Sequence, residues 1–205
     1  MRADFDRQLD NLISKGYPDL AGLAVDEFAS RLAPLADQLP NLPGPAAGDR
    51  AFIPFAIVVT NELVPPDQAM PAIQLGRKQG FTTMSADDLK RFIPIDGIAR
   101  PNRAAYLVTG LDTGPDTLNV IPDEAIKTIT AQGRSPLTVD EGIALVMQYP
   151  DVLKTRNCFS MLGSRCGDRR VPALWLSAGR PRLGWCWAGA PHTWLGSASC
   201  ATRLG

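Results

Sequence analysis

Apolar residues in the first forty positions recur at the spacing of amphipathic helices. Between residues 4 and 15 they return every three or four positions, and Gly16 and Pro18 then end the pattern. A second helical pattern follows Asp26, an N-cap residue type, and Pro34 places a kink or an end inside it. We therefore expect a helical hairpin at the N-terminus.

The next segment has no periodicity and marks a boundary. Residues 40–49 read PNLPGPAAGD, with three prolines and two glycines, a composition typical of a linker. A boundary near residue 45 divides the chain into a helical appendage with its linker, 1–45, and an α+β domain, 46–205. The length suits one main domain with its own core.

Strand and helix patterns alternate through the middle of the chain. Runs of β-branched and aromatic residues predict strands at 51–60, 104–111 and 117–121, the last two joined as a hairpin. Capping signals predict helices at 85–92, 122–132 and 138–148. The last of these helices opens with Thr138-Val139-Asp140-Glu141, the pattern of a capping box.

The last third predicts strands at 171–177, 183–188 and 192–200, with turns that contain glycine or proline between them. An antiparallel β-meander fits this order best. The fold class is therefore α+β: an N-terminal helical hairpin, a mixed central region with two further helices, and the C-terminal meander.

Charge and hydropathy narrow the function classes. Lys and Arg number 21, as do Asp and Glu, so a formal net charge of zero argues against nucleic acid as a partner. No apolar run reaches the about 18 residues of a membrane span, and no signal peptide is apparent, so we expect a cytoplasmic protein without a membrane partner. In a reducing compartment, cysteines are free thiols or metal ligands more often than disulfides.

Residues suited to chemistry are concentrated between Cys158 and Cys200, which hold all four cysteines, the one histidine and all four tryptophans. Zinc is the first interpretation, since thiolate and imidazole are its preferred ligands. The gaps between them are longer than in zinc knuckles, so the alternative is small buried thiols in an apolar core. The candidate ligands are Cys158, Cys166, Cys186, His192 and Cys200.

A cysteine nucleophile is the second interpretation. Cys166 lies in GSRCGDRR, whose arginines would lower its thiol pKa, and Asp168 or His192 would assist it. Cys186 lies between two tryptophans in WCW, so on a strand it faces the opposite side from both. No activated-cysteine motif surrounds either residue.

The same region could bind a small molecule. Arg165 and Arg169 of LGSRCGDRR suit a phosphate or carboxylate, unless they pair with nearby acids in a solvated turn. The indoles of the region would line a pocket or belong to the core. The expected pocket residues are Trp185, Trp187, Trp194 and His192, with Trp175 beside them.

Asp112-Thr113-Gly114 matches the aspartic-protease triplet. That chemistry needs two such loops, and this chain has one, so we expect a hairpin turn.

Segments along most of the chain, densest in the last quarter, carry a family resemblance: GYP at 16–18, LAGL at 20–23, CFSMLGSRCGD, RVPALWLS and LGWCWAGAPHTWLGSASC. The chain resembles an uncharacterised actinobacterial domain-of-unknown-function family. The resemblance implies a cytoplasmic protein and supplies no catalytic residues. Three hypotheses follow: binding of a small ligand or partner protein in the C-terminal region, a cysteine-dependent enzyme, and a structural zinc protein.

Overall fold

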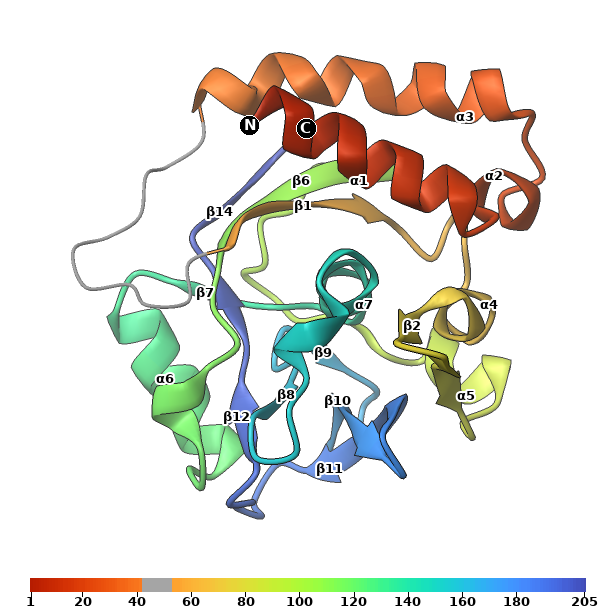
Figure 1. The fold of residues 1–205 in the computed structure, drawn as a ribbon. Helices are drawn as coiled ribbons and strands as arrows, with labels where there is room; N and C mark the ends of the chain where they lie inside the picture. The colour runs from red at the N-terminus through yellow and green to blue at the C-terminus, as the bar shows by residue number, and fades with distance from the viewer. Residues whose placement is uncertain (42–52) are drawn as a thin grey trace.

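The structure is a computed structural model that describes residues 1–41 and 53–205 (Figure 1). N-terminal helices lie along one end of the molecule, and strands β10 (Arg170–Ser177) and β11 (Arg180–Trp187) lie at the other end, while the C-terminus returns to the side of the helices. The α+β class is confirmed. The predicted boundary near residue 45 and most of the linker lie outside the described residues.

The predicted helical hairpin is present at the N-terminus. Its helices are α1 (Arg2–Ser14), α2 (Tyr17–Leu20), α3 (Val25–Leu32) and the 3-10 helix η1 (Ala33–Asn41). Pro34 falls where α-helix gives way to 3-10 helix, as its missing N–H requires. The predicted cap at Asp26 is wrong: Ala24 is the N-cap, and Asp26 lies in the first turn, where the helix dipole favours its carboxylate.

The side chain of Gln8 holds α1 to the edge of a sheet. Its amide nitrogen donates to the carbonyl of Phe55 at 3.1 Å, and its oxygen accepts from the N–H of Ile57 at 2.9 Å. Gln8 thus bonds to β1 (Ile53–Val59) as a neighbouring strand would. Because Gln8 is fully buried, these bonds are shielded from water and fix where the helix packs.

The N-terminal sheet has the order β1-β6-β14, with both pairs antiparallel. Strand β6 (Ala105–Leu111) was predicted within one residue, while β14 (Thr202–Leu204) was not predicted. The predicted hairpin strand at 117–121 is wrong: Thr117 ends the short 3-10 helix η2 (Pro115–Thr117), and residues 118–121 form a turn and irregular chain. Gly114, with φ of 77°, lies so close to the backbone of Ser197 that a Cβ would be 2.2 Å from its carbonyl oxygen. The turn at Gly114 therefore packs against the backbone of Ser197, and the chain after it does not return along β6 as a hairpin strand.

The C-terminal sheet has the order β12-β8-β10-β11-β4. The hairpin of the predicted meander is confirmed as β10 paired antiparallel with β11. The third strand differs: β12 runs parallel to β8, because β4 already occupies the outer edge of β11 at Arg182 and Leu183. The strands are β12 (Leu195–Ser197), β8 (Cys158–Ser160), β10 (Arg170–Ser177), β11 (Arg180–Trp187) and β4 (Phe81–Thr82).

Helix α7 (Val139–Gln148) lies between the two sheets (Figure 1). All but one of its residues are buried, and Gly142 packs so closely on Met161 that a Cβ would collide with its sulfur. Its start agrees with the predicted capping box, since the Glu141 carboxylate accepts from the Thr138 N–H at 2.8 Å. The other helices are α4 (Pro66–Ala72), α5 (Ala86–Lys90), α6 (Pro122–Ala131) and the 3-10 helix η3 (Pro150–Val152).

A buried ion pair connects α7 to the C-terminal strand. Arg203 of β14 donates to both carboxylate oxygens of Glu141, to the Ser135 hydroxyl at 2.7 Å and to the Pro136 carbonyl at 3.0 Å. The Tyr106 hydroxyl donates to the same carboxylate at 2.8 Å. The side chains of Glu141 and Arg203 are almost fully buried, and each has several partners. The remaining short strands are β2 (Gln74–Leu75), β3 (Lys78–Gln79), β5 (Ile93–Pro94), β7 (Ser135–Pro136), β9 (Ser164–Arg165) and β13 (Ser199–Cys200).

Candidate functional site

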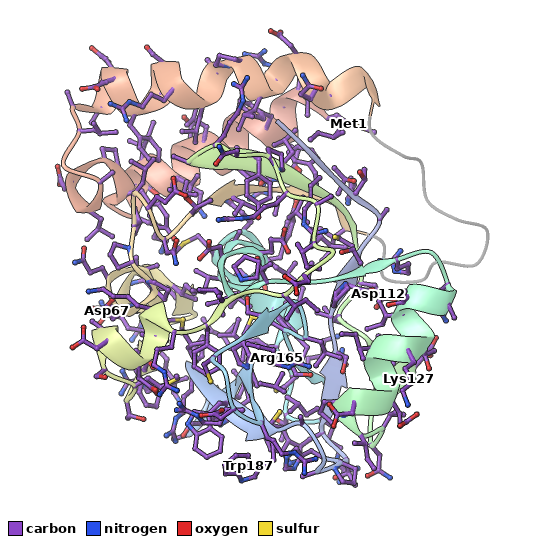
Figure 2. The ribbon with its side chains drawn as sticks, turned by 180° about the vertical axis from the view of Figure 1, so that it is seen from behind. Met1, Asp67, Asp112, Lys127, Arg165 and Trp187 are labelled. Atoms are coloured by element: carbon purple, nitrogen blue, oxygen red, sulfur yellow. The ribbon has the colours of Figure 1, made fainter. Side chains whose placement is uncertain are left out.

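Aromatic side chains surround one cavity of about 280 Å³ at the C-terminal sheet. They come from β10, from β11 and from the segment that leads to β12. In Figure 2, Trp187 marks this end of the molecule, opposite the N-terminal helices. The structure thus brings together Trp185, Trp187, His192 and Trp194, the four residues expected to line a pocket. The full lining is Ala173, Trp175, Trp185, Cys186, Trp187, His192, Trp194 and Leu195.

Trp175 lines this cavity, and the space its indole occupies is left open by a glycine on the neighbouring strand. Its indole ring covers Gly184, where a Cβ would come within 2.3 Å of the ring. Trp194 lies beside Trp175, with ring centroids 6.2 Å apart and tilted by 59°, and His192 lies 5.4 Å from Trp194. Rings packed in this way have few alternative rotamers, so the cavity wall is preorganised.

Trp185 and Trp187 present apolar surface to solvent. They are 37% and 51% exposed, and their rings meet edge to face at 4.8 Å. Cys186 between them is buried, as strand alternation predicted. Two adjacent exposed indoles are unusual at a surface with no partner and are typical of a binding site.

The cysteines are poor nucleophiles. All four are free and buried. Burial raises the pKa of Cys186 to about 11 and that of Cys200 to about 12, so almost no thiolate forms near neutral pH. Burial also raises the pKa of Cys166, and its thiol donates to the Asp168 carboxylate at 3.1 Å. The charge of Arg170 does lower the pKa of Cys166, as the sequence predicted, but burial and the hydrogen bond to Asp168 raise it by more, so the expected net lowering is wrong.

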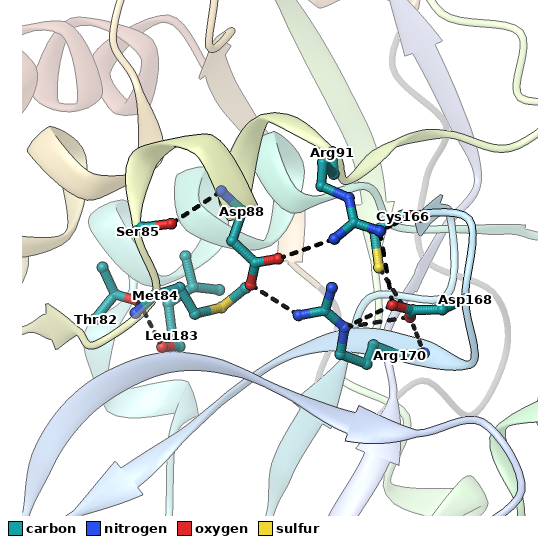
Figure 3. Close-up of polar contacts among 9 residues, drawn as sticks. All are labelled: Thr82, Met84, Ser85, Asp88, Arg91, Cys166, Asp168, Arg170 and Leu183. Atoms are coloured by element: carbon teal, nitrogen blue, oxygen red, sulfur yellow. Dashed lines mark hydrogen bonds and ion pairs between the residues drawn. The ribbon is translucent and has the colours of Figure 1, made fainter.

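Burial is the main cause of the raised pKa of Cys166, and the lowering by arginine charge is limited because Arg170 has carboxylate partners of its own. Arg170 bonds to Asp88 at 2.8 Å and to Asp168 at 3.0 Å, and Arg91 lies 3.8 Å from Asp168 (Figure 3). These carboxylates offset the positive charge that would have stabilised a Cys166 thiolate. The backbone of Asp88 is fixed by the predicted cap, since the Ser85 hydroxyl accepts from its N–H (Figure 3).

Arg165 and Arg169, the expected anion contacts, do not line the cavity. Arg165 donates to the carbonyls of Leu162 and Ser164, and burial lowers the pKa of its guanidinium. Arg169 is exposed and lies 3.6 Å from Asp123. The loop LGSRCGDRR therefore fits the alternative interpretation, in which its arginines pair with groups of the protein itself.

The five candidate zinc ligands do not form one cluster. Within residues 1–41 and 53–205, no group of three or more His, Cys, Asp or Glu side chains is arranged to hold a metal ion. The thiol of Cys158 instead donates to the Lys154 carbonyl at 3.1 Å, and Cys200 is fully buried on β13. These cysteines fit the alternative to zinc, in which they are small buried thiols of the core.

The Asp112-Thr113-Gly114 triplet forms a tight turn. The Asp112 carboxylate accepts from the N–H of Gly114 at 2.7 Å, and Thr113 is buried. The turn was expected, although it leads into η2 rather than into a hairpin strand.

Another cavity, of about 450 Å³, lies near the end of α7. Its lining includes Tyr149, Lys154 and Ile53, the first residue described after the gap at 42–52. The aromatic cavity is the stronger candidate because its lining lies far in sequence from that gap and collects the residue types that bind ligands.

Two arginines that the sequence analysis did not assign to the site lie near Trp175. Arg182 stacks on the Trp175 ring, and Arg180 stacks on Phe81 beside it. A signal for these cations was present in the sequence, since no Asp or Glu occurs from residue 169 to the end.

None of the helices in the described ranges is both long and apolar enough to cross a bilayer. No curated protein and no solved structure matches the chain. Residues 11–205 match a protein family described as a family of unknown function, DUF5701. The match spans nearly the whole chain, and the protein therefore belongs to the DUF5701 family.

Proposed function

We propose that this protein binds a small molecule, in the cytoplasm, through the aromatic cavity of the C-terminal sheet. The observation that carries the proposal is that four tryptophans and the one histidine line a single cavity of about 280 Å³. Concave, mostly apolar sites with a few polar groups are the usual form of ligand pockets. The actinobacterial origin that the resemblance suggested stays a prediction.

The size of the cavity limits what enters it. Pockets for drug-sized ligands hold about 300–1,000 Å³, so this one accepts a single ring system rather than a large molecule. Indole walls favour a planar, apolar group that stacks on them. His192, next to Trp194, adds one polar group that can hydrogen-bond to the ligand.

A cysteine-dependent reaction has less support. Cys186 and His192 both line the cavity, but burial raises the pKa of that thiol to about 11. An attacking thiolate needs the opposite shift. A structural zinc site also gains no support from the positions of the cysteines.

Calorimetric titration with 2-naphthol, a neutral two-ring probe, tests the proposal. We expect saturable binding to one site and, in Trp187→Ala, a loss of affinity of about tenfold, which corresponds to about 1.4 kcal/mol. Trp187 is half exposed, so its removal leaves the fold intact. Ile93→Ala, at an exposed apolar residue outside the cavity, is the matched control. Absence of saturable binding, or equal loss in both variants, would overturn the proposal.

A further inference from the structure

The zero net charge of the chain conceals an uneven distribution. Residues 169–205 contain five arginines and no Asp or Glu, and residues 68–86 contain Arg77 and Lys78, again with no acid. These two segments meet in space, because β4 pairs with β11 at the Phe81–Arg182 position. One edge of the C-terminal sheet is therefore basic. We call Arg77, Lys78, Arg180 and Arg182 the basic edge.

Backbone carbonyls hold two of these cations in place. Lys78 donates to the Ala178 carbonyl at 2.7 Å, and the Nε of Arg180 donates to the Gln79 carbonyl at 2.9 Å. Each bond joins the β2–β3 hairpin to the β10–β11 hairpin. The two hairpin turns therefore lie side by side, and like charges are kept close to one another.

Aromatic rings order the arginines of the basic edge. The guanidinium of Arg180 lies 4.4 Å from the centre of the Phe81 ring. That of Arg182 lies 5.6 Å from the same ring and 5.2 Å from the Trp175 ring. Stacking on a ring leaves the edge of the guanidinium, with its N–H groups, available to an anion.

The basic edge has no carboxylate partner in the described part of the chain. None of its four cations lies within 4.0 Å of an Asp or Glu side chain there, whereas Arg169, Arg170 and Arg203 all do. Unpaired, ordered cations repel one another, and an anion from outside would relieve that repulsion.

Trp175 links the basic edge to the cavity, since it lines the cavity and also carries Arg182. We infer that the ligand is a planar ring bearing a phosphate or carboxylate, with the ring in the aromatic cavity and the anion bound by Arg182 and Arg180. The inference rests on the proposed function and adds the charge of the ligand. The small volume of the cavity agrees with a ligand whose polar part extends beyond it.

Comparing 2-naphthyl phosphate with 2-naphthol tests the inference, because the two probes share a ring and differ in charge. We expect the phosphate ester to bind at least tenfold more tightly in dilute buffer. Arg182→Gln and, separately, Arg180→Gln should each bring the ratio of the two affinities close to one, whatever either substitution does to 2-naphthol itself. Arg31→Gln, at an exposed arginine on α3, should behave as the wild type.

The outcomes separate the two proposals. If both probes bind equally, or if neither basic-edge variant weakens the phosphate ester, the inference is overturned and the proposed function stands. If neither probe binds, the proposed function fails. If inorganic phosphate alone displaces the ester and 2-naphthol does not bind, the anion binds without a ring, which overturns both. Melting temperatures of the variants show that loss of binding is not loss of fold.

A ring with a phosphate occurs in a free nucleotide and in a nucleic-acid chain. Adenosine 5′-monophosphate and a single-stranded deoxyadenosine ten-mer distinguish these sources. If the mononucleotide and the ten-mer bind with equal affinity per site, the ligand is a free nucleotide. If the ten-mer binds much more tightly and its affinity falls steeply with salt, the ligand is a nucleic-acid chain. Failure of both to displace 2-naphthyl phosphate would overturn the nucleotide form of the inference.

Discussion

Arg203 and Arg182 both lie on strands of the C-terminal region, yet their surroundings are opposite. The Arg203 guanidinium is buried and donates to a carboxylate, a hydroxyl and a carbonyl. Arg182 stacks between two rings, donates to the Thr83 hydroxyl, and has no carboxylate within 4.0 Å in the described residues. The first arginine has its partners within the protein, and the second lacks a counter-charge.

The difference separates structural from functional polar groups. A buried charge is tolerated only when its hydrogen bonds and counter-charge are supplied, as α7 and β14 supply them for Arg203. A cation that is ordered but lacks a counter-charge contributes little to the fold. The buried pair of Glu141 and Arg203 is therefore structural, whereas the proposed binding surface consists of the aromatic cavity and the basic edge.

Arg203→Gln should have the largest effect on stability. Removing this charge leaves the Glu141 carboxylate buried and uncompensated, which costs about 3–5 kcal/mol of unfolding free energy. Urea denaturation measures this loss. Lys127→Gln is the matched control, since its pair with Glu124 is exposed and should contribute little to stability. Equal losses in both variants would show that the buried pair is not structural.

Asp140, the neighbour of Glu141, provides a pH test of how a buried carboxyl behaves when its counter-charge is weaker than that of Glu141. Its nearest cation is Arg100 at 3.9 Å, and burial raises its pKa to about 6. The unfolded carboxyl has a pKa near 3.9, so between these values the folded state binds the extra proton. This group therefore favours folding most below about pH 4, and its contribution falls by up to about 3 kcal/mol as the pH rises through 6.

The measurement is the unfolding free energy from pH 4 to pH 7 in the wild type and in Asp140→Asn. The difference between the two proteins isolates this carboxyl from others, such as Asp168, whose pKa is lowered to about 2 mainly by the Arg170 N–H. We expect the variant to gain relative stability as the pH rises. A constant difference across the range would contradict a raised pKa.

Gly184→Ala should disturb the binding surface directly. The new Cβ would lie 2.3 Å from the Trp175 ring, so the ring must move at a cost of about 1–3 kcal/mol. Affinity for 2-naphthol should fall with it. In the control, Gly189→Ala, the nearest atom is the mobile end of Arg169, which can shift cheaply. Unchanged binding in Gly184→Ala would mean that the wall formed by Trp175 is not part of the site.

Arg180→Gln should change stability least, by no more than about 0.5 kcal/mol, because the residue is exposed and has no ion pair in the described ranges. Thermal unfolding measures the effect. A loss comparable to that of Arg203→Gln would assign Arg180 to the fold and would remove the contrast between the two regions.

Local signals predicted the elements whose cause is local. The helix at 122–132 has Pro at its first position and acids in its first turn, and α6 occupies Pro122–Ala131. The helix at 138–148 has its cap in the sequence, and α7 follows it. The alternation in WCW likewise placed Cys186 inside and both tryptophans outside. Each of these depends on neighbours within a few residues, and sequence spacing expresses such neighbours directly.

Strand partners and charge pairing depended on residues far away. The residues around Leu111 do not indicate that β6 pairs with β1 and β14, which are distant in sequence. The close approach of Gly114 to Ser197, which excludes the predicted hairpin, also exists only in the folded chain. The arginines of GSRCGDRR looked like an anion site, and Asp88 on another helix neutralises one of them. The charge of Arg170 still lowers the pKa of Cys166, as the sequence predicted, but burial and the hydrogen bond to Asp168 outweigh it, so the net shift is upward.

Composition alone located the candidate site, since cysteines, tryptophans and the histidine crowd into residues 158–200. The tertiary structure decided which of them lie together: the tryptophans, His192 and Cys186 line one cavity, while the other three cysteines are buried away from it. It also decided which cations have a carboxylate partner within residues 1–41 and 53–205. The physical reason is that pKa, pairing and cavity shape arise from atoms within a few ångströms, and those atoms come from strands distant in the chain.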